Sequence, residues 1–334
     1  MISIMPFQLR KILSKLLAVS GAINYFWYKL PNGVYAFNYH RIGDKDNTPY
    51  DRAIFSCTQY AFEQQIILLK QHFKIINTVE LAELITQNKV QDDRFAVITF
   101  DDGYLDNYTE ALPILQKHQV KAVFYLTTAF LNGDQLTWWD EIAYLLRKSH
   151  GKEYQLPNST LKHLLEKENI DQIIRIIMTE IKQSRTLSVL AALEDLREKF
   201  PQAKDKLSAE NAQLFMGWEH AQALLVEGME IGSHTLTHPI LSQLENEQHR
   251  AEIVDSKSIL EERLNCTINS IAYPVGRYYC YNENSIKYTT AAGYKVGFNN
   301  EPGFHRSISN SLDMNRFCVA SSDINYLKYE CCFT

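Results

Sequence analysis

The order of apolar and polar residues along the chain predicts alternating strands and helices. Alternating or continuously apolar stretches rich in β-branched and aromatic residues predict strands at 34–39, 73–77, 95–100, 120–127, 229–233, 270–273 and 294–298. Apolar residues at three- and four-residue spacing predict helices at 62–73, 79–85, 106–118, 218–226, 245–264 and 283–292. Such repetition is typical of a parallel sheet with crossover helices, so we predict an α/β fold. Thr78 is expected to cap the helix that follows it.

The alternation stops near Leu131 and resumes near Trp218. Leu and Ile at helical spacing over residues 158–200 predict a helical insertion of three or four helices, at about 132–216. The chain has no internal repeat and no low-complexity linker. We therefore predict one barrel domain over residues 31–334, with seven or eight parallel strands, interrupted by this insertion.

Residues 1–30 form a separate amino-terminal segment. Basic residues at Arg10, Lys11 and Lys15 precede an apolar stretch and the aromatic run 25–28. Lys15 interrupts the apolar stretch, which is too short for a membrane span and has no convincing secretory cleavage site. We expect an amphipathic helix that packs on the main domain; the alternative is peripheral membrane contact through residues 1–30.

The composition is that of a globular protein without a nucleic-acid footprint. The 334 residues are 46% hydrophobic and 22% charged, with a net charge of −5. These values exclude a disordered chain and a basic surface for nucleic acid. The six cysteines form no CxxC pair, so we expect reduced thiols.

Two adjacent carboxylates, Asp101 and Asp102, end the apolar run 95–100. They repel one another and lose hydration beside a buried strand, so such a pair is typical of a site that binds a cation or transfers a proton. The alternative is an ordinary Asp-Asp-Gly turn, completed by Gly103.

Other predicted strands also end in polar residues. His40 follows the first strand, and His234 and His238 follow the strand at 229–233. In a barrel, catalytic groups gather at the carboxyl ends of the strands. Two imidazoles and one carboxylate from another strand end make a three-ligand site with open positions, which suits Zn²⁺ best, with Co²⁺, Ni²⁺ or Mn²⁺ as alternatives. The competing interpretation is that both histidines are structural.

These residues resemble a known family. Residues 99–104 (Thr-Phe-Asp-Asp-Gly-Tyr), 234–238 (His-Thr-Leu-Thr-His) and 273–276 (Tyr-Pro-Val-Gly) resemble, in order, the first three motifs of the polysaccharide deacetylases of carbohydrate esterase family 4, NodB-like proteins. The resemblance covers about 34–130 and 216–300. It implies a distorted (β/α) barrel and a metal-dependent hydrolase that removes acetyl from an N-acetylated sugar.

The resemblance also implies residue roles. Asp102, His234 and His238 would hold the metal, Asp101 would be the general base, and Val275 would supply a backbone N–H to the oxyanion. The residues expected to bind substrate are Tyr104, Tyr273, Pro274, Arg277, Arg41, Trp138 and Trp139. For the two tryptophans, anchoring of the insertion is an equal alternative to stacking on a sugar.

Two departures from the family pattern affect the supporting residues. Ala272 stands where the family commonly has an Arg that pairs with the base, and Arg41 or Arg277 is expected to substitute. The late Leu-x-His motif that supplies the general acid is absent. The branch that includes poly-N-acetylglucosamine deacetylases has an early Tyr-His instead, which Tyr39-His40 matches, so His40 is the candidate general acid.

The expected function is N-deacetylation of an N-acetylglucosamine-like sugar in a polysaccharide or glycan intermediate. Two alternatives remain: hydrolysis of another C–N bond in a small or cyclic amide, and a sugar-binding barrel whose site has decayed. The expected partner is carbohydrate, not nucleic acid. A cytoplasmic or peripheral inner-membrane location is expected from the cysteines and the amino terminus, while a polymer-modifying role leaves export open.

Overall fold

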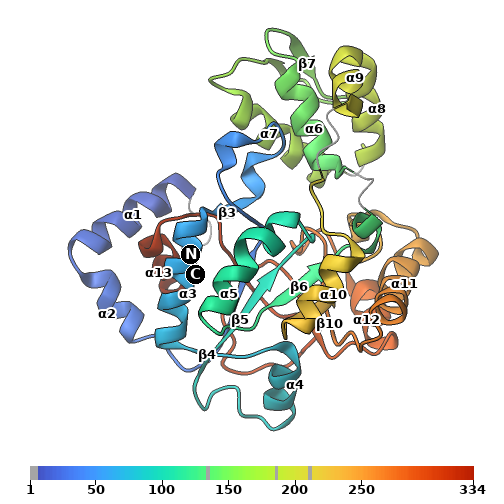
Figure 1. The fold of residues 1–334 in the computed structure, drawn as a ribbon. Helices are drawn as coiled ribbons and strands as arrows, with labels where there is room; N and C mark the ends of the chain where they lie inside the picture. Colours follow the sequence, from blue (N-terminus) through green and yellow to red (C-terminus); the bar gives the residue numbers. More distant parts are fainter. Residues whose placement is uncertain (1–6, 133–135, 185–186, 210–212) are drawn as a thin grey trace. The chain divides into compact units, whose positions relative to one another are not determined.

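A computed structural model describes residues 7–132, 136–184, 187–209 and 213–334 (Figure 1). The described chain divides into two compact units. The first comprises residues up to 43, 56–132 and 215–334, and the second comprises 44–55 and 133–214. Among the described helices, none is both long and apolar enough to cross a lipid bilayer.

The first unit is built on an eight-stranded sheet whose described pairings are all parallel. The strand order is β11-β10-β9-β6-β5-β1-β12, and β4 pairs with β5. The strands are β1 (Gly33–Tyr39), β4 (Lys74–Ile75), β5 (Arg94–Phe100), β6 (Val123–Leu126), β9 (Glu230–Ser233), β10 (Ser270–Ala272), β11 (Val296–Phe298) and β12 (Phe317–Cys318). A separate two-stranded sheet pairs β2 (Arg41–Ile42) with β3 (Phe55–Cys57). This parallel sheet confirms the predicted (β/α) barrel fold.

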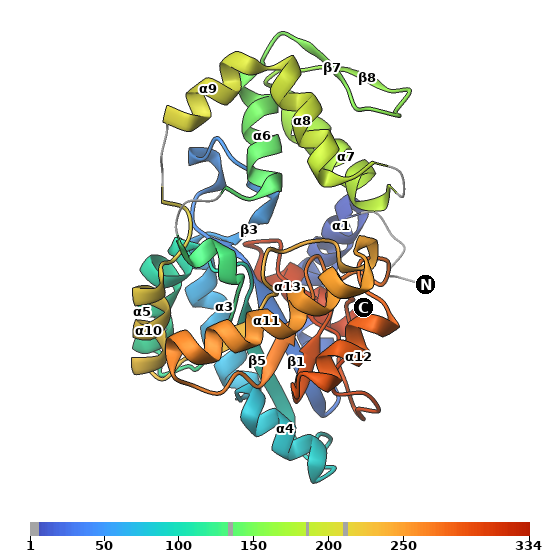
Figure 2. The same ribbon diagram turned by 90° about the vertical axis from the view of Figure 1, so that its right-hand side faces the viewer.

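Helices surround this sheet, as Figures 1 and 2 show. They are α1 (Phe7–Val19), α2 (Ala22–Tyr28), α3 (Gln59–His72), α4 (Thr78–Thr86), α5 (Leu112–Lys117), α10 (Trp218–Val226), α11 (Asn246–Leu264), α12 (Glu283–Ala291) and α13 (Ile324–Phe333). The cap predicted at Thr78 is wrong by one residue. Asn77 is the N-cap, because its side chain and that of Glu80 form a reciprocal capping box.

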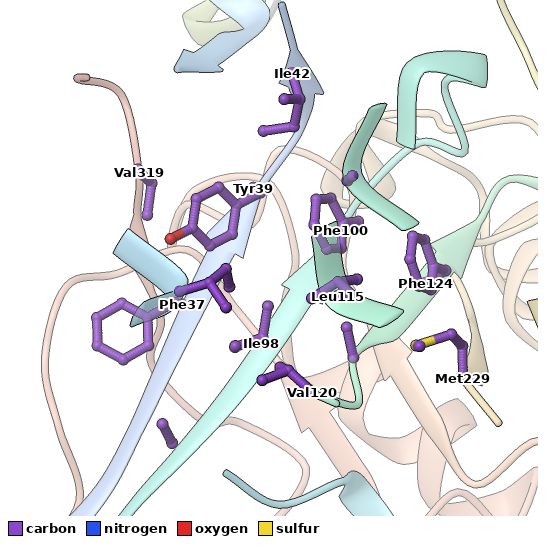
Figure 3. Packing of buried hydrophobic residues seen from close by; sticks show 14 of the residues in the cluster. Phe37, Tyr39, Ile42, Ile98, Phe100, Leu115, Val120, Phe124, Met229 and Val319 are labelled. Carbon is purple, nitrogen blue, oxygen red and sulfur yellow. The ribbon is translucent and has the colours of Figure 1, made fainter. Parts of the chain in front are cut away.

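The strands are buried on both faces, and alternate residues enter different clusters. Val34 and Ala36 of β1 pack with Val97 of β5 in one cluster. Phe37 and Ile98 point the other way, into a second cluster beneath the helices, part of which is drawn in Figure 3. Because side chains alternate along a strand, the first cluster defines the interior side of the sheet.

The second unit contains four described helices and a hairpin. They are α6 (Trp138–Lys148), α7 (Ile170–Gln183), α8 (Val189–Lys199), α9 (Pro201–Ala209) and the antiparallel pair β7 (Glu153–Gln155) and β8 (Lys162–Leu164). The helices agree with the predicted insertion. Strand β8 does not, since it lies in the stretch 158–200 that was predicted to be helical. Residues 44–55 belong to this unit, a feature that the hydrophobic pattern did not indicate.

Candidate metal and catalytic site

The interior side of the sheet becomes polar at the carboxyl ends of the strands. Asn38, Thr99 and Asp101 continue the alternation of Val34 and Val97, and all three are fully buried. The register between β1 and β5 pairs Asn38 with Thr99. Asp101 comes directly after β5 and continues its pairing with β1, because the Asp101 N–H donates to the Tyr39 carbonyl at 2.9 Å. The alternation itself therefore directs this carboxylate inward.

Residues next to Asp101 and in the loop after β9 have a strained, left-handed backbone. Asp102 has φ of 75°, and after β9 Thr235 and His238 have φ of 66° and 61°. Residues other than glycine rarely adopt this left-handed region, and such strain clusters at functional sites. The turn at Gly103, φ 85°, completes the loop after β5.

Asp102, His234 and His238 form a buried three-residue cluster. Their potential ligand atoms all lie within 4.8 Å of one another. Asp102 Oδ1 is 3.4 Å from His234 Nε2 and 3.3 Å from His238 Nε2. One oxygen and two nitrogens that converge in this way are a donor set for zinc or a similar divalent ion.

Two further observations fit a metal ion. Within the described residues, Asp102 Oδ1 is buried and has no hydrogen-bond partner. His234 Nδ1 lies 2.8 Å from the Ala272 carbonyl, which fixes the proton on Nδ1 and leaves the Nε2 lone pair facing Asp102. Metal-binding histidines are commonly oriented by this kind of contact. The residues present therefore fit the ion expected from the sequence.

Arg316 holds Asp101 beside this cluster. Its guanidinium donates to both carboxylate oxygens, at 2.8 and 2.7 Å, and to Thr99 Oγ1 at 3.1 Å. Asn38 Nδ2 donates to Asp101 Oδ2 at 2.8 Å. Arg316 and Asp101 are both fully buried. Asp101 Oδ2 is 3.9 Å from His234 Nε2, so the anchored carboxylate lies next to the potential ligands without joining them.

The buried charges keep both aspartates ionised. Burial raises the pKa of Asp101, but Arg316, His234 and His40 outweigh it and hold this pKa below its usual value. Burial likewise opposes ionisation of Asp102, but the neighbouring His234, His238 and His40 outweigh it and hold this pKa well below the usual value. Each side chain thus carries the negative charge that a base or a ligand needs.

His40 lies just after β1, next to this pair. Its backbone N–H donates to Ser56 Oγ at 2.9 Å, and its carbonyl accepts from Asn107 Nδ2 at 2.6 Å. The side chain is half-buried. His40 is one of the neighbours that lower the pKa of Asp101 and of Asp102. The structure therefore brings His40 to the same strand ends as the carboxylates.

Glu252 of α11 supports the histidine loop. Its carboxylate accepts from the N–H groups of Leu236 and Thr237, at 2.9 and 2.8 Å, and from Thr237 Oγ1 at 2.5 Å. These residues lie between the two histidines. Glu252 is thus a positioning residue, and the sequence offered no signal for it beyond its place in the predicted helix 245–264.

The turn after β10 is the candidate oxyanion site. Val275 has φ of 61° and Gly276 has φ of 67°. Asn300 Nδ2 donates to the Val275 carbonyl at 3.2 Å, which fixes the peptide on that side. Pro274 is buried and Val275 is half-buried. A β-branched residue in this region is an outlier, so the surrounding contacts must hold the turn in place.

Several residues expected to bind substrate have other contacts. Tyr104 and Tyr273 are fully buried, and Tyr273 Oη donates to the Leu312 carbonyl at 2.8 Å, so a role of these rings in substrate binding stays a prediction. Arg41 pairs with Asp106 at 2.7 Å. The arginine contact expected from Arg41 or Arg277 is made by Arg316 instead.

Arg277, Trp138 and Trp139 are the other residues expected to bind substrate. Arg277 is half-exposed and pairs with Glu301 at 3.3 Å, in the loop that follows Val275. Trp138 and Trp139 belong to the second unit, at the start of α6. Trp139 is buried there, so it anchors the core of that unit, while Trp138 is half-buried and lies edge-on to it at 5.3 Å between ring centroids.

Comparisons with known proteins agree with this geometry. The sequence pattern described as polysaccharide deacetylase matches residues 88–297. The Bacillus subtilis (strain 168) protein YxkH, which carries the name of a polysaccharide deacetylase, is 25% identical over 69% of this chain. The alignment covers 53% of YxkH, so the chain spans about half the length of that relative. The Escherichia coli (strain K12) poly-β-1,6-N-acetyl-D-glucosamine N-deacetylase is 30% identical over 28% of this chain and 14% of its own length.

Solved structures share the fold. IcaB from Ammonifex degensii has a TM-score of 0.57 and 14% identity, covering 90% of this chain and 98% of its own. The Streptococcus pyogenes deacetylase PplD, solved in complex with acetate, has a TM-score of 0.56 and 18% identity, covering 87% and 93%. At these identities the likeness supports the barrel architecture.

Proposed function

The chain belongs to the polysaccharide deacetylase family, and from this membership we propose that it is a metal-dependent N-deacetylase. The proposed substrate is an N-acetylglucosamine-like unit of a polysaccharide or glycan intermediate. The proposed ligands are Asp102, His234 and His238, with Zn²⁺ as the first candidate ion.

One observation supports this proposal above the others. A carboxylate oxygen without a hydrogen bond in the described chain, Asp102 Oδ1, faces two imidazole nitrogens, while the adjacent Asp101 is held separately by Arg316. Two neighbouring aspartates thus have different surroundings. This division fits one ligand and one base, which hydrolysis of an unactivated amide requires.

The residues suit the proton transfers of amide hydrolysis. When bound, a divalent ion would lower the pKa of water and polarise the acetyl carbonyl. Asp101 would accept the proton of the attacking water as the new C–O bond forms, and the Val275 N–H would donate to the carbonyl oxygen. His40 would then donate a proton to the sugar nitrogen as the C–N bond breaks. The products are acetate and a free amino sugar.

Metal content and acetate release from N-acetylglucosamine oligomers test the proposal together. The purified protein should contain about one divalent ion and release acetate. Asp102→Asn should lose both properties, whereas Asp101→Asn should keep the ion and lose acetate release by about 10²-fold or more, the usual contribution of a general base. A protein with neither metal nor acetate release would overturn the proposal, and full activity of His40→Ala would reassign the general acid.

The two alternative functions separate in the same assay. Hydrolysis of small or cyclic amides without acetate from sugar oligomers would favour the other C–N hydrolase. The support for the other alternative, a sugar-binding barrel whose site has decayed, was the absence of the family arginine at Ala272. Arg316 supplies a bidentate contact to Asp101, so that support is gone.

A further inference from the structure

Helix α1 leaves a stripe of four apolar residues exposed. Leu9, Ile12, Leu16 and Val19 are 42%, 56%, 61% and 90% exposed. Their spacing of three, four and three residues places them on one face of the helix. An amphipathic helix on a globular protein normally buries such a stripe, whereas this one is exposed.

The opposite face of α1, on which Leu13 and Leu17 are half-buried, is attached to the carboxyl-terminal helix. Ser14 is fully buried, and Arg10 donates to both oxygens of Glu330 in α13, at 3.0 and 2.9 Å. Phe7 meets Tyr326 of α13 edge-on, with ring centroids 5.3 Å apart. Figure 1 shows α1 and α2 beside α13. These contacts fix which face of α1 remains outside.

Helix α2 extends the exposed surface with aromatic rings. Tyr25 and Tyr28 are 62% and 63% exposed, while Trp27 of the same helix is buried. Tyrosine has an apolar ring and a polar hydroxyl, and it is enriched where hydrocarbon meets water. The surface therefore combines aliphatic and interfacial aromatic side chains.

The charge of this segment selects the partner. Besides Arg10, which is paired with Glu330, residues 7–30 contain Lys11, Lys15 and Lys29 and no carboxylate, in a chain whose net charge is −5. Two copies of the surface placed face to face would bring like charges together, with no acidic residue of the segment to pair with them. An anionic lipid headgroup layer complements both the charge and the apolar stripe.

We propose that the stripe of Leu9, Ile12, Leu16 and Val19, with Tyr25 and Tyr28, docks on the surface of an anionic lipid bilayer. Helix α1 lies along the interface, its apolar face among the acyl chains and its lysines at the headgroups. This property is independent of the catalytic proposal, because none of these residues belongs to the candidate site.

Flotation of the full chain with lipid vesicles tests the proposal. The protein should float with vesicles of phosphatidylcholine and phosphatidylglycerol at 3:1, and much less with phosphatidylcholine alone. Ile12→Glu/Leu16→Glu should lower the partition coefficient by about a hundredfold, from the transfer free energy of two large aliphatic side chains. Lys15→Gln should lower it about fivefold, the contribution of one basic residue near an anionic surface.

Val226→Glu is the matched control, since Val226 is 76% exposed at the end of α10. It should float like the original protein, and all variants should keep acetate release from soluble oligomers, which reports folding. Absence of flotation by the original protein would overturn the proposal, as would flotation of the double variant at the original level. A dimer in light scattering that the double variant abolishes would assign the surface to a second copy instead.

Discussion

At the scale of single residues, Arg316 decides how the carboxylate pair is divided. Its two contacts compensate the charge of Asp101 in a place with no solvent, and Asn38 satisfies one oxygen further. Asp102 instead faces the imidazoles of His234 and His238. The different surroundings of the proposed base and the proposed ligand therefore originate in a residue 215 positions away in the sequence.

Removing that cation should destabilise the protein. Arg316→Met leaves the Asp101 carboxylate buried and uncompensated, so we expect the free energy of unfolding to fall by about 3–5 kcal/mol. Denaturant titration measures this loss. Arg316→Met/Asp101→Asn should recover a large part of it, because the unpaired charge is gone. A double variant as unstable as the single one would contradict this explanation.

At the strained turn, by contrast, we expect a substitution of Val275 that does not destabilise the protein. Left-handed backbone costs an L-residue about 1–2 kcal/mol, and Val275→Gly removes this cost together with a half-buried side chain. We expect the free energy of unfolding to stay unchanged or to rise by up to about 1 kcal/mol. Val254→Gly, at a half-buried valine inside α11, should instead lose about 1 kcal/mol. Equal losses for the two variants would show that the turn carries no strain.

At the scale of elements, the hydrophobic pattern predicted the strands whose residues form a local apolar or alternating run. The strands β1, β5, β6, β9, β10 and β11 all lie within predicted strands or overlap them, and the predicted aspartates and histidines follow β1, β5 and β9. Strand β12 has only two residues and follows an irregular stretch, so periodicity had nothing to detect. Arg316 precedes it directly and was missed for the same reason. The hairpin of β7 and β8 was missed because a few apolar residues at mixed spacing fit a helix equally well.

Helix α11 should control metal affinity through Glu252. The carboxylate accepts two N–H groups and a hydroxyl between the two histidines, so it holds the loop in the conformation that lets both rings converge. We expect Glu252→Gln to weaken zinc binding by about 10–100-fold, the usual effect of removing a support behind a ligand. Competition with a chromogenic chelator measures this affinity.

Glu262→Gln is the control for this change, because Glu262 is exposed on the same helix. It should bind zinc like the original protein. Unchanged affinity in Glu252→Gln would mean that the loop holds its shape without the carboxylate, and the backbone contacts of Thr235 would then have to be sufficient.

At the scale of the whole molecule, the candidate site joins segments that fold far apart in sequence. Asp102 follows β5, the histidines follow β9, and the oxyanion turn follows β10, on strands that share one sheet. Strand β6 lies between β5 and β9, so the proposed ligands, when they hold an ion, would link the ends of two strands that are not neighbours. Binding should therefore couple directly to the stability of the first unit.

This coupling predicts a metal-dependent unfolding temperature. A ligand at about 100 times its dissociation constant stabilises a folded protein by about 2.7 kcal/mol, which for a domain of this size raises Tm by roughly 5 °C. Chelator-treated protein should show this rise on addition of zinc, followed by differential scanning calorimetry. Asp101→Asn should show the same rise because Asp101 is not a ligand, whereas Asp102→Asn and His238→Ala should show almost none. A rise in Tm that survives Asp102→Asn would locate the ion elsewhere. If Asp101→Asn lost the rise as completely as Asp102→Asn, both carboxylates would bind the ion, and the proposed division into base and ligand would be wrong.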